Sequence, residues 1–584
     1  QPLKEQDGER EDDVKGLKGA LLAGAMGAMM LAGVTAGGAA RAENGQKPQY
    51  GGSLEIGTVY VTLTALSWDP ADFNWKLNHD TGMFYEQLFA GDLSKSKKAG
   101  GPYNFVPDAW LPTDAIRGEL IESWEWKQDP LRVEMKVRKG VVFPEKPGVM
   151  KKRDFTAEDI LFTFNRLNKS PKRLLGYFDH IEKVEAPDPH TVVFYMKHYF
   201  AEWDYQFGWG YYSAIHPKEV ADAGATNWKN VNGTGPFMLT DFIPGNSNTY
   251  TKNPDYWGVE KIGGQEYKLP FVDKVTYRTI KDEATYVTAL RTGKLDMLEN
   301  IRWQNVDSLK KSAPQLKWSR WLNQSGTFMA MRVDVDGPFK DVRVRRALNY
   351  AVNKQEIVQA YYNGNAELFA YPQHPDYVGY FEPLDKQPAS VQELFKYDPA
   401  KAKKLLAEAG FPKGFTTKVQ VCSCNADHMD LLPLVAGYLE QVGVKLEIQP
   451  MEYGAFLSAM SSKTMTPAYF MNNGHTNPIT TIRKSFGTGQ MWNPSGWSDP
   501  AFDKKIDEVY REPDEAKRQK MLREMTTEIV DKAPYIWLPI PYNYAAWWPW
   551  VKNYDGELRA GAVRPAPIYA RIWVDQEMKK KMGH

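Results

Sequence analysis

Hydrophobic and polar residues alternate with a period of two in several short runs of this chain. The longest runs cover residues 50–63, which begin with a glycine pair, and residues 122–139, where two runs flank the dipeptide Asp129-Pro130. Such alternation is typical of half-buried strands, and the Asp-Pro dipeptide indicates a hairpin turn between them. Shorter runs at residues 418–421 and 445–448 predict further strands.

Longer segments between these runs have the spacing of amphipathic helices. Thr156 followed by Asp159 forms a capping pattern ahead of an apolar face that reaches Phe164. Further helices are predicted at residues 284–292, 342–360, 399–409, 431–442 and 514–531. Helices that alternate with strands along the chain predict α/β lobes.

The length of the chain requires more than one lobe. It has 584 residues, whereas single cores stop growing at about 250–300 residues. The content of 42% hydrophobic and 25% charged residues is that of a globular protein. Lys plus Arg number 73 and Asp plus Glu number 72. This balance argues against a nucleic-acid-binding protein, and it gives no net attraction to an anionic membrane.

The first 42 residues are predicted to be a secretory signal peptide. Residues 19–40 contain no charged side chain, Lys15 and Lys18 precede them, and Ala40-Arg41-Ala42 forms a small-x-small cleavage site. A membrane anchor is the alternative, because the uncharged run is long enough to span a bilayer. No cysteine lies near the cleavage site. The prediction is therefore a periplasmic protein without a lipid anchor.

The chain contains two cysteines, Cys422 and Cys424, in the sequence Val-Gln-Val-Cys-Ser-Cys. On a strand, positions two apart face the same side, and their Cα atoms lie near the upper limit for a disulfide. We therefore expect two small apolar residues with free thiols, and neither a metal site nor a redox site.

Seven segments, in order along about 450 residues of the chain, resemble the bacterial extracellular solute-binding proteins of family 5, which include oligopeptide-, dipeptide- and nickel-binding proteins. They are residues 120–124 with 137–143, 155–163, 232–237 (Asn-Gly-Thr-Gly-Pro-Phe), 253–258 (Asn-Pro-Asp-Tyr-Trp-Gly), 290–296, 342–348, and 397–399 with 402–406. Each segment alone is weak evidence, but their order makes the resemblance specific.

The resemblance implies a two-lobed α/β fold of the periplasmic-binding-protein type (class II, cluster C) with an extra subdomain. It implies a first lobe at residues 43–83, 206–324 and 534–584, an extra subdomain at 84–205 and a second lobe at 325–533. It also implies an ABC permease and its ATPase as partners, a monomer, and a small oligomeric solute as ligand. No enzymatic activity, cofactor or metal is expected.

In peptide-binding proteins of this family, an Asp in a segment of the form Trp-x-x-Asp-x-x-Asp-Pro pairs with the amino terminus of the ligand. The segment here that resembles it is residues 471–478, Met-Asn-Asn-Gly-His-Thr-Asn-Pro. Gly474 occupies the amine-pairing position and Asn477 that of the later acid, and neither is charged. A neutral ligand with many hydroxyl groups therefore fits better than a free peptide amine, because a buried ammonium needs an opposite charge.

The candidate ligand-binding residues combine aromatic rings with neutral polar groups. Flat apolar faces of sugars pack on Trp and Tyr rings, and Asn side chains both donate and accept hydrogen bonds. Core packing is the alternative for each Trp. His475 is expected to form hydrogen bonds and not to bind metal, because no second His or Cys stands at ligand spacing. The candidates are Tyr60, Trp209, Tyr211, Asn473, Gly474, His475, Trp492 and Trp497.

Three ligand and activity hypotheses follow, of which a neutral oligosaccharide is preferred. The second is an oligopeptide held through its backbone as an added strand. The third is a secreted glycoside hydrolase with two carboxylates. The sequence contains neither Gly-x-Ser-x-Gly nor His-Glu-x-x-His, so two other hydrolase signatures are missing.

Overall fold

The computed structural model describes residues 47–58, 67–74, 77–107 and 110–584. Its largest sheet has the strand order β10-β11-β14-β1-β15-β23-β16, and β18 pairs with β23. β1 runs parallel to β14 and β15, whereas β23 is antiparallel to β15 and β16. The bounds are β1 Ser53–Thr58, β10 Phe237–Ile243, β11 Ser247–Lys252, β14 Lys274–Thr279, β15 Met297–Ile301, β16 Lys317–Leu322, β18 Ala366–Glu367 and β23 Ile540–Trp547.

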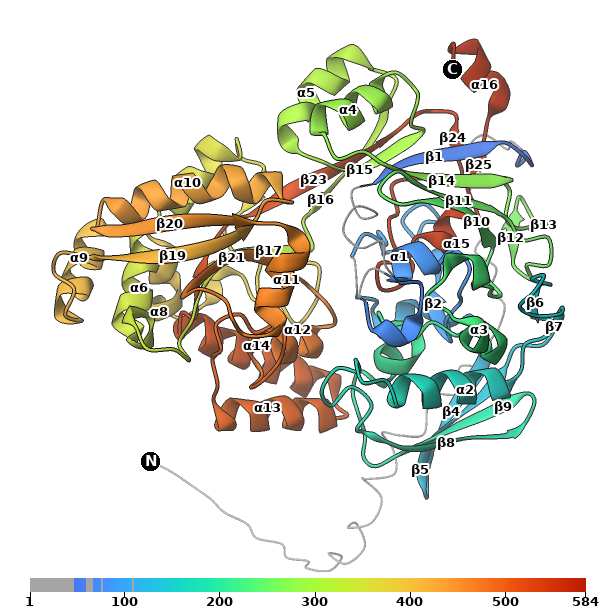
Figure 1. Ribbon diagram of the computed structural model, residues 1–584, viewed down its shortest axis with the longest axis horizontal. Helices are drawn as coiled ribbons and strands as arrows, with labels where there is room; N and C mark the ends of the chain where they lie inside the picture. The colour runs from blue at the N-terminus through green and yellow to red at the C-terminus, as the bar shows by residue number, and fades with distance from the viewer. Residues whose placement is uncertain (1–46, 59–66, 75–76, 108–109) are drawn as a thin grey trace, which may run out of the picture. The chain divides into compact units, whose positions relative to one another are not determined.

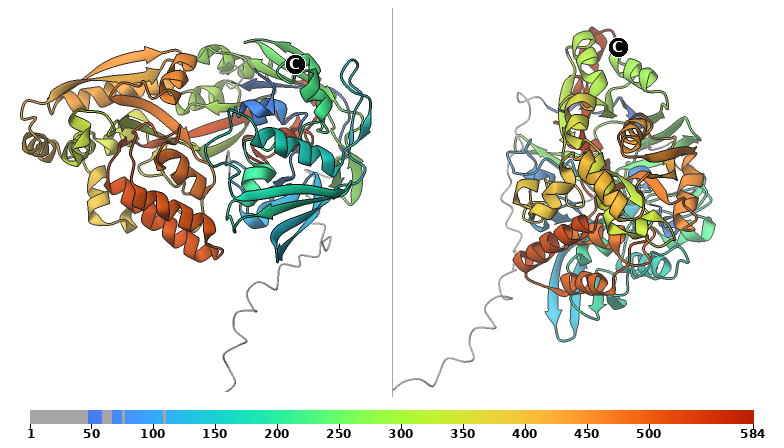
Figure 2. Two further views of the ribbon diagram at one scale, coloured as in Figure 1. Left: turned by 60° about the horizontal axis from the view of Figure 1, so that its bottom comes forward. Right: turned by 90° about the vertical axis from the view of Figure 1, so that its left-hand side faces the viewer.

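A second sheet, whose strands β19 and β20 are orange in Figure 1, has the order β20-β19-β21-β17-β22. β19, β20 and β21 are parallel, and β17 is antiparallel to β21 and β22. The strands are β17 Ser325–Met331, β19 Phe415–Cys422, β20 Val444–Met451, β21 Ala468–Gly474 and β22 Tyr535–Trp537. The helices are α6 Val342–Ala351, α9 Pro399–Glu408, α10 Ala426–Glu440, α11 Tyr453–Ser461, α12 Pro478–Phe486, α13 Pro500–Arg511 and α14 Glu515–Asp531. Figure 2 shows α13 and α14 side by side, and α10 packs on β19 and β20.

A third, antiparallel sheet has the order β4-β5-β9-β8, with α2 Ala157–Asn168 packed against it. Its strands are β4 Ile121–Gln128, β5 Leu131–Val137, β8 Ile181–Asp188 and β9 Thr191–Met196. β4 and β5 form the predicted hairpin around Asp129-Pro130. Thr156 and Asp159 form the predicted capping box, so both local predictions are confirmed.

The remaining elements are short or lie beside these sheets. They are α1 Leu77–Thr81, α3 Lys218–Ala223, α4 Glu283–Arg291, α5 Trp303–Ser312, α7 Lys354–Glu356, α8 Ala389–Gln392, α15 Ala566–Tyr569, α16 Gln576–Lys581, β2 Phe89–Gly91, β3 Ile116–Gly118, β6 Val142–Phe143, β7 Arg153–Asp154, β12 Val259–Ile262, β13 Gln265–Lys268, β24 Val551–Lys552 and β25 Trp573–Val574. Among the described helices, none is both long enough and apolar enough to cross a membrane.

Helix and strand positions follow the sequence-based expectations, with two differences. The helix expected at 342–360 stops at Ala351, because Val352 is extended and the Asn353 side chain caps a new short helix, α7. The helix expected at 431–442 begins earlier, at Ala426, because the Asn425 side chain accepts a hydrogen bond from the His428 backbone N–H. The early strand was expected to reach residue 63, but residues 59–66 lie outside the described ranges.

The chain passes between the two large sheets through short connections. β16 ends at Leu322 and β17 begins at Ser325; β22 ends at Trp537 and β23 begins at Ile540. The backbone N–H of Asn323 donates to the Pro541 carbonyl at 2.9 Å, which ties the two connections together. β22 still pairs with β17 of the second sheet. The division of the chain into lobes at 324/325 and 533/534 stays a prediction.

Candidate ligand-binding cleft

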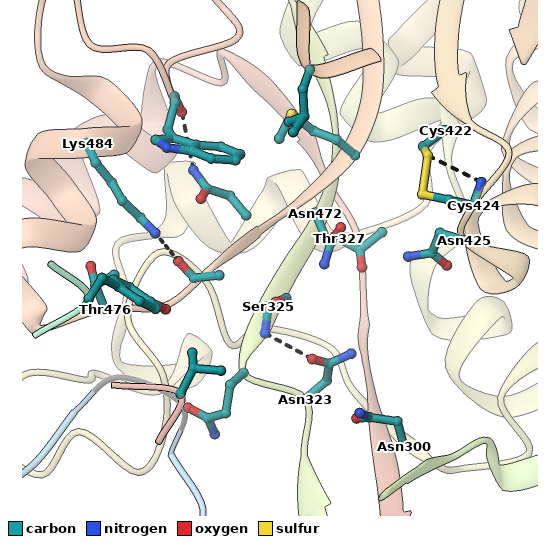
Figure 3. A pocket seen from close by; sticks show the side chains of 18 of the residues that line it. Asn300, Asn323, Ser325, Thr327, Cys422, Cys424, Asn425, Asn472, Thr476 and Lys484 are labelled. Atoms are coloured by element: carbon teal, nitrogen blue, oxygen red, sulfur yellow. Dashed lines mark hydrogen bonds between the residues drawn. A yellow bond between two sulfur atoms is a disulfide. The ribbon is translucent and has the colours of Figure 1, made fainter. Parts of the chain in front are cut away.

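A cavity of about 650 Å³ is lined by residues from both large sheets and from the segment that follows α2. Figure 3 shows part of its lining, with Asn300 from β15, Thr327 from β17 and Asn472 from β21 around the same space. This volume is typical of small-molecule binding sites. Because the walls come from segments that the two short connections join, any movement at these connections would change the cavity.

Carboxamide and hydroxyl side chains form much of the cavity wall. Asn473 is held in place because its Nδ2 donates to Ser485 Oγ at 3.0 Å and to the Trp492 carbonyl at 3.2 Å. Each carboxamide offers both a donor and an acceptor, as a peptide group does. The set comprises Gln206, Asn300, Asn323, Gln324, Asn425, Asn472, Asn473, Gln490 and Asn543, with the hydroxyls of Ser325, Thr327, Thr476 and Thr480.

Several buried polar atoms of lining residues have no hydrogen-bond partner within the described part of the chain. They include the donors Trp303 Nε1, Arg302 Nε and Gln206 Nε2 and the acceptors Gln324 Oε1 and Gln206 Oε1. Buried polar groups are nearly always paired in folded proteins, and the cost of leaving one unpaired is about 1–3 kcal/mol. These atoms have almost no exposed surface, so they reach a ligand only after a small movement of the side chains. Aromatic residues complete the wall: Tyr211, Trp303, Trp321, Tyr453, Trp492 and Tyr542.

Basic residues outnumber acidic ones in the lining. Arg302 Nη1 lies 3.2 Å from Glu283 Oε2, while its Nη2 lies 3.4 Å from Asp427 Oδ1 and 2.8 Å from Asp430 Oδ2. The only two carboxylates in this lining, Glu283 and Asp427, are thus both paired with one guanidinium. The basic residues are Arg173, Lys281, Arg302, Arg483, Lys484 and Arg559. The cleft therefore has an excess of positive charge.

Lys484 lies on α12 and reaches the end of β21. Its Nζ donates to the carbonyl oxygen of Gly474, as the dashed line in Figure 3 marks. Burial lowers the pKa of Lys484 to about 7, because a charged ammonium is disfavoured away from water. A neutral carbonyl is its hydrogen-bond partner.

Contacts across the cleft join the extra-subdomain side to α12 and α13. Glu202 Oε1 accepts from the backbone N–H of Ile479 at 2.9 Å, and Oε2 accepts from the Thr480 N–H at 3.2 Å. Asn477 at the N-cap of α12 makes no capping hydrogen bond with its own side chain, so Glu202 supplies it. Phe200 also stacks on Tyr510, with ring centroids 4.3 Å apart. Burial raises the pKa of Glu202 to about 7.

The two cysteines form a disulfide, which corrects the expectation of free thiols. Cys422 is the last residue of β19, and Cys424 lies in the turn before α10. This turn brings the two Cα atoms to 5.2 Å, within the range for a disulfide and less than two extended residues would span. Both cysteines line the cavity (Figure 3).

A thiol assay checks this correction. Denatured protein that has never been exposed to reductant is expected to show no reaction with Ellman's reagent, because both sulfurs are bonded. The same protein after reduction should show two thiols per chain, one for each cysteine of the sequence. Two thiols before reduction would restore the original interpretation.

The structure places four of the predicted site residues in the cavity wall and three outside it. Tyr211, Asn473, Gly474 and Trp492 line the cavity. Tyr60 lies outside the described residues. His475, Trp209 and Trp497 do not line the cavity, which differs from the expectation for all three.

Packing explains these three positions. Trp209 is 0% exposed, and its Nε1 donates to Asp204 Oδ2 at 3.1 Å. Trp497 packs edge-on against Phe502 at 5.0 Å. His475 is enclosed by Tyr371 and His374, and its Nε2 contacts the Ala370 carbonyl at 3.1 Å. His475 follows the last residue of β21, where the chain leaves the strand.

Several lining residues were missed by the sequence analysis. Lys484, Trp303 and Asn300 come from a helix and from the end of a strand, and no motif marks them. Asn425 did carry a signal, since an Asn ahead of an apolar helical run is a typical N-cap. Within the described ranges, no group of three or more His, Cys, Asp or Glu side chains is placed to hold a metal ion.

Comparisons with known proteins now identify the family. Residues 115–493 match the model of the bacterial extracellular solute-binding proteins, family 5, middle part. The chain belongs to this family. Among curated family 5 relatives, heme-binding protein A of Haemophilus influenzae is 26% identical over 482 residues, which cover 77% of this chain and 84% of that protein. Di/tripeptide-binding protein 1 of Pseudomonas aeruginosa is 26% identical, covering 71% and 79%.

Solved structures show the same family 5 fold. DppA of Helicobacter pylori, an ABC transporter-associated periplasmic binding protein in complex with the peptide STSA, has a TM-score of 0.73, 24% identity, and coverage of 90% of this chain and 99% of that chain. AppA of Bacillus subtilis, an oligopeptide-binding protein in complex with a nonapeptide, has a TM-score of 0.72, 22% identity, and coverage of 90% and 100%. The predicted family and the two-lobed α/β fold are confirmed. The preference for an oligosaccharide finds no support in these relatives.

Proposed function

We propose that this protein is the periplasmic substrate-binding subunit of an ABC importer and that its ligand is a short peptide. The observation that carries the peptide assignment is the cavity wall. Nine carboxamide residues line one cavity of about 650 Å³, and Trp303 and Gln324 in the same lining each carry a buried polar atom without a partner in the described part of the chain. Each residue of a peptide offers one N–H donor and one C=O acceptor. These groups can pair with the carboxamides of the wall along the length of the ligand.

The relatives support a peptide over a neutral sugar. The relatives are named as binding proteins for peptides, glutathione and heme. The oligopeptide alternative from the sequence therefore replaces the oligosaccharide preference. The argument for a sugar was the lack of charge at Gly474 and Asn477, and it considered acidic positions only. It did not include the basic residues that line the same cavity.

Binding without chemistry is the second part of the proposal. A glycosidase needs two carboxylates on either side of the bond to be cleaved, one of them able to give up a proton. The two carboxylates of this lining, Glu283 and Asp427, both contact Arg302. Asp427 also accepts hydrogen bonds from Tyr361 at 3.1 Å and Tyr362 at 2.8 Å. These pairings favour a structural role for both acids.

Transport requires that the ligand control the shape of the protein. We infer a hinge at residues 323–324 and 538–539, where the chain changes sheet. A ligand that contacts both sheets stabilises the closed form. The gain comes from the contacts that the ligand makes in the closed form and not in the open form. The closed form would then dock on the permease and its ATPase.

Calorimetric titration tests the peptide assignment. Protein that has been unfolded, dialysed and refolded is titrated with trialanine and, separately, with maltotriose. Trialanine is expected to bind and maltotriose to give no heat beyond dilution. In Trp303→Ala, which removes an indole from the wall, peptide affinity should fall roughly tenfold.

Trp318→Ala is the matched control, because Trp318 is a half-buried tryptophan of the same lobe that does not line the cavity. Its affinity for trialanine should equal that of the unchanged protein. Binding of maltotriose without any response to peptides would overturn the assignment.

A further inference from the structure

The side chain of Lys484 is a cation without a carboxylate partner in the described part of the chain. Its Nζ hydrogen bond goes to the Gly474 carbonyl, and no acidic oxygen lies within ion-pair distance. Lys281 in the same lining has no carboxylate partner in the described part of the chain either, but it is exposed to water, and two arginines of the cavity are paired with acids. Arg173 lies 2.9 Å from Asp179, and Arg559 lies 2.8 Å from Glu299.

Arg483, the neighbour of Lys484 on α12, has different partners from the other arginines of the cavity. It donates to the Leu175 carbonyl, and its guanidinium carbon lies 5.9 Å from the Tyr510 ring centroid. It is thereby directed to the contacts that join α12 to the extra-subdomain side. Lys484, in contrast, reaches the wall at Gly474, where β21 ends, near Thr476 (Figure 3).

An unpaired ammonium removed from water is costly, and a protein normally supplies it with an opposite charge. Here burial alone lowers the pKa of Lys484 to about 7, with no acidic group opposing that shift. A carboxylate brought by a ligand would provide the missing charge and a charge-assisted hydrogen bond, while the wall amides bind the uncharged part of the molecule. The cavity thus favours an acidic ligand.

We propose that Lys484 is the anion subsite of the cleft and that it binds a carboxylate of the ligand. The proposal rests on the proposed function and makes it more specific: the substrates are peptides with a free carboxylate. That carboxylate comes either from the carboxyl terminus or from an acidic side chain, and both have the same chemistry at Nζ.

Two pairs of peptides distinguish these sources by calorimetry on the full chain. Trialanine and trialanine amide differ only in the terminal carboxylate. Acetyl-Ala-Glu-Ala amide and acetyl-Ala-Gln-Ala amide differ only in a side-chain carboxylate. In one pair, the acid is expected to bind roughly 10- to 100-fold more tightly than its neutral partner, and Lys484→Met should abolish that preference.

Lys504→Met is the matched control, because it removes an exposed lysine of the same lobe, on α13, that does not line the cavity. The preference for the acid should persist in this variant. The proposal is overturned if the unchanged protein shows no preference in either pair, or if the preference survives in Lys484→Met. In either case, tight binding of the neutral peptides would leave the proposed function intact.

Lysine NMR on the unchanged protein provides a second readout that does not depend on a variant that folds. With 13Cε-labelled lysine, the pKa of Lys484 should rise when the acidic peptide binds and stay unchanged with its neutral partner. If none of the four peptides binds, the proposed function has failed, and succinate becomes the probe. A rise in the Lys484 pKa at saturating succinate then supports the subsite, and no rise overturns it.

Discussion

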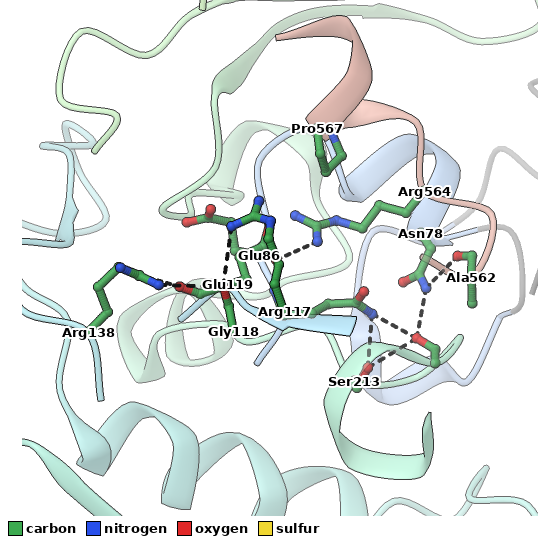
Figure 4. Close-up of polar contacts among 12 residues, drawn as sticks. Asn78, Glu86, Arg117, Gly118, Glu119, Arg138, Ser213, Ala562, Arg564 and Pro567 are labelled. Carbon is green, nitrogen blue, oxygen red and sulfur yellow. Dashed lines mark hydrogen bonds and ion pairs between the residues drawn. The ribbon is translucent and has the colours of Figure 1, made fainter. Parts of the chain in front are cut away.

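Arg564→Leu is expected to lower the free energy of unfolding by about 3–5 kcal/mol. Arg564 Nη1 pairs with Glu119 Oε2, and both side chains are 1% exposed (Figure 4). Glu119 also accepts the Gln87 N–H at 2.9 Å. Without the guanidinium, Glu119 would remain a buried charge close to a second buried carboxyl, Glu86, whose pKa burial and Glu119 already raise to about 8. Urea unfolding followed by circular dichroism measures the loss.

Arg278→Leu is the matched control, because Arg278 pairs with Glu55 at 2.8 Å in the same lobe but is 45% exposed. Exposed pairs contribute about 0–1 kcal/mol, so this variant should stay close to the original stability. The double variant Arg564→Leu/Glu119→Leu should recover much of the loss, because it leaves no unpaired charge from this pair. Equal stability of Arg564→Leu and Arg278→Leu would contradict the argument.

Local sequence signals predicted local structure. The hairpin at Asp129-Pro130 and the capping box of Thr156 and Asp159 depend on residues a few positions apart, and both form as expected. The order of seven short segments predicted the family and therefore the fold. These segments identify the framework of the protein, because they include turns and helix starts more than ligand contacts.

The site depends on contacts between distant segments, which the sequence pattern does not contain. Arg564 and Glu119 are 445 positions apart, and Glu202 caps a helix that begins at Pro478. Trp209 and Trp492 look alike as isolated tryptophans, but only Trp492 lines the cavity. Packing against segments that are distant in the sequence decides which tryptophan belongs to the core and which lines the cavity. A short stretch of sequence does not contain this information. Lys484 was missed for the same reason.

The cysteines show a third limit, which concerns one turn. The sequence analysis extended the strand through Cys424, which would keep the two sulfurs apart. The strand ends at Cys422 instead, because Asn425 caps α10 and the chain must turn to enter that helix. The wrong predicted start of α10 and the wrong prediction of free thiols therefore have the same cause, the missed N-cap. An Asn recognised as the cap would have predicted both.

Glu202→Ala is expected to weaken peptide binding roughly 5- to 100-fold, because it removes the cap that holds α12 in the closed form. Three donors lose their acceptor: the N–H groups of Ile479 and Thr480 and the Thr480 hydroxyl. In the open form, water would accept hydrogen bonds from these three donors. The free-energy cost of the unpaired donors therefore arises only when the cleft closes. Titration with trialanine measures the affinity, and solution scattering measures whether saturating peptide still reduces the radius of gyration.

Glu202 should also make closure depend on pH. Burial raises its pKa from the ordinary 4.5 to about 7, with a smaller contribution of the same sign from Asp204, whereas the hydrated carboxyl of an open form keeps the ordinary value. At a pH between these two pKa values, closure therefore takes up a proton on Glu202. Peptide affinity should consequently fall as pH rises from about 5 to about 8. The titration of Lys484 on ligand binding has the same sign, so a variant is needed to separate the two.

Glu202→Gln isolates the contribution of this carboxyl, because its amide oxygen still accepts hydrogen bonds and does not titrate. The fall in affinity with pH should become shallower in this variant, and the part that remains should disappear with Lys484→Met. Glu182→Ala, an exposed glutamate on β8, is the control and should change neither affinity nor its pH dependence. If Glu202→Ala and Glu182→Ala bind peptide equally well, Glu202 does not hold the cleft closed.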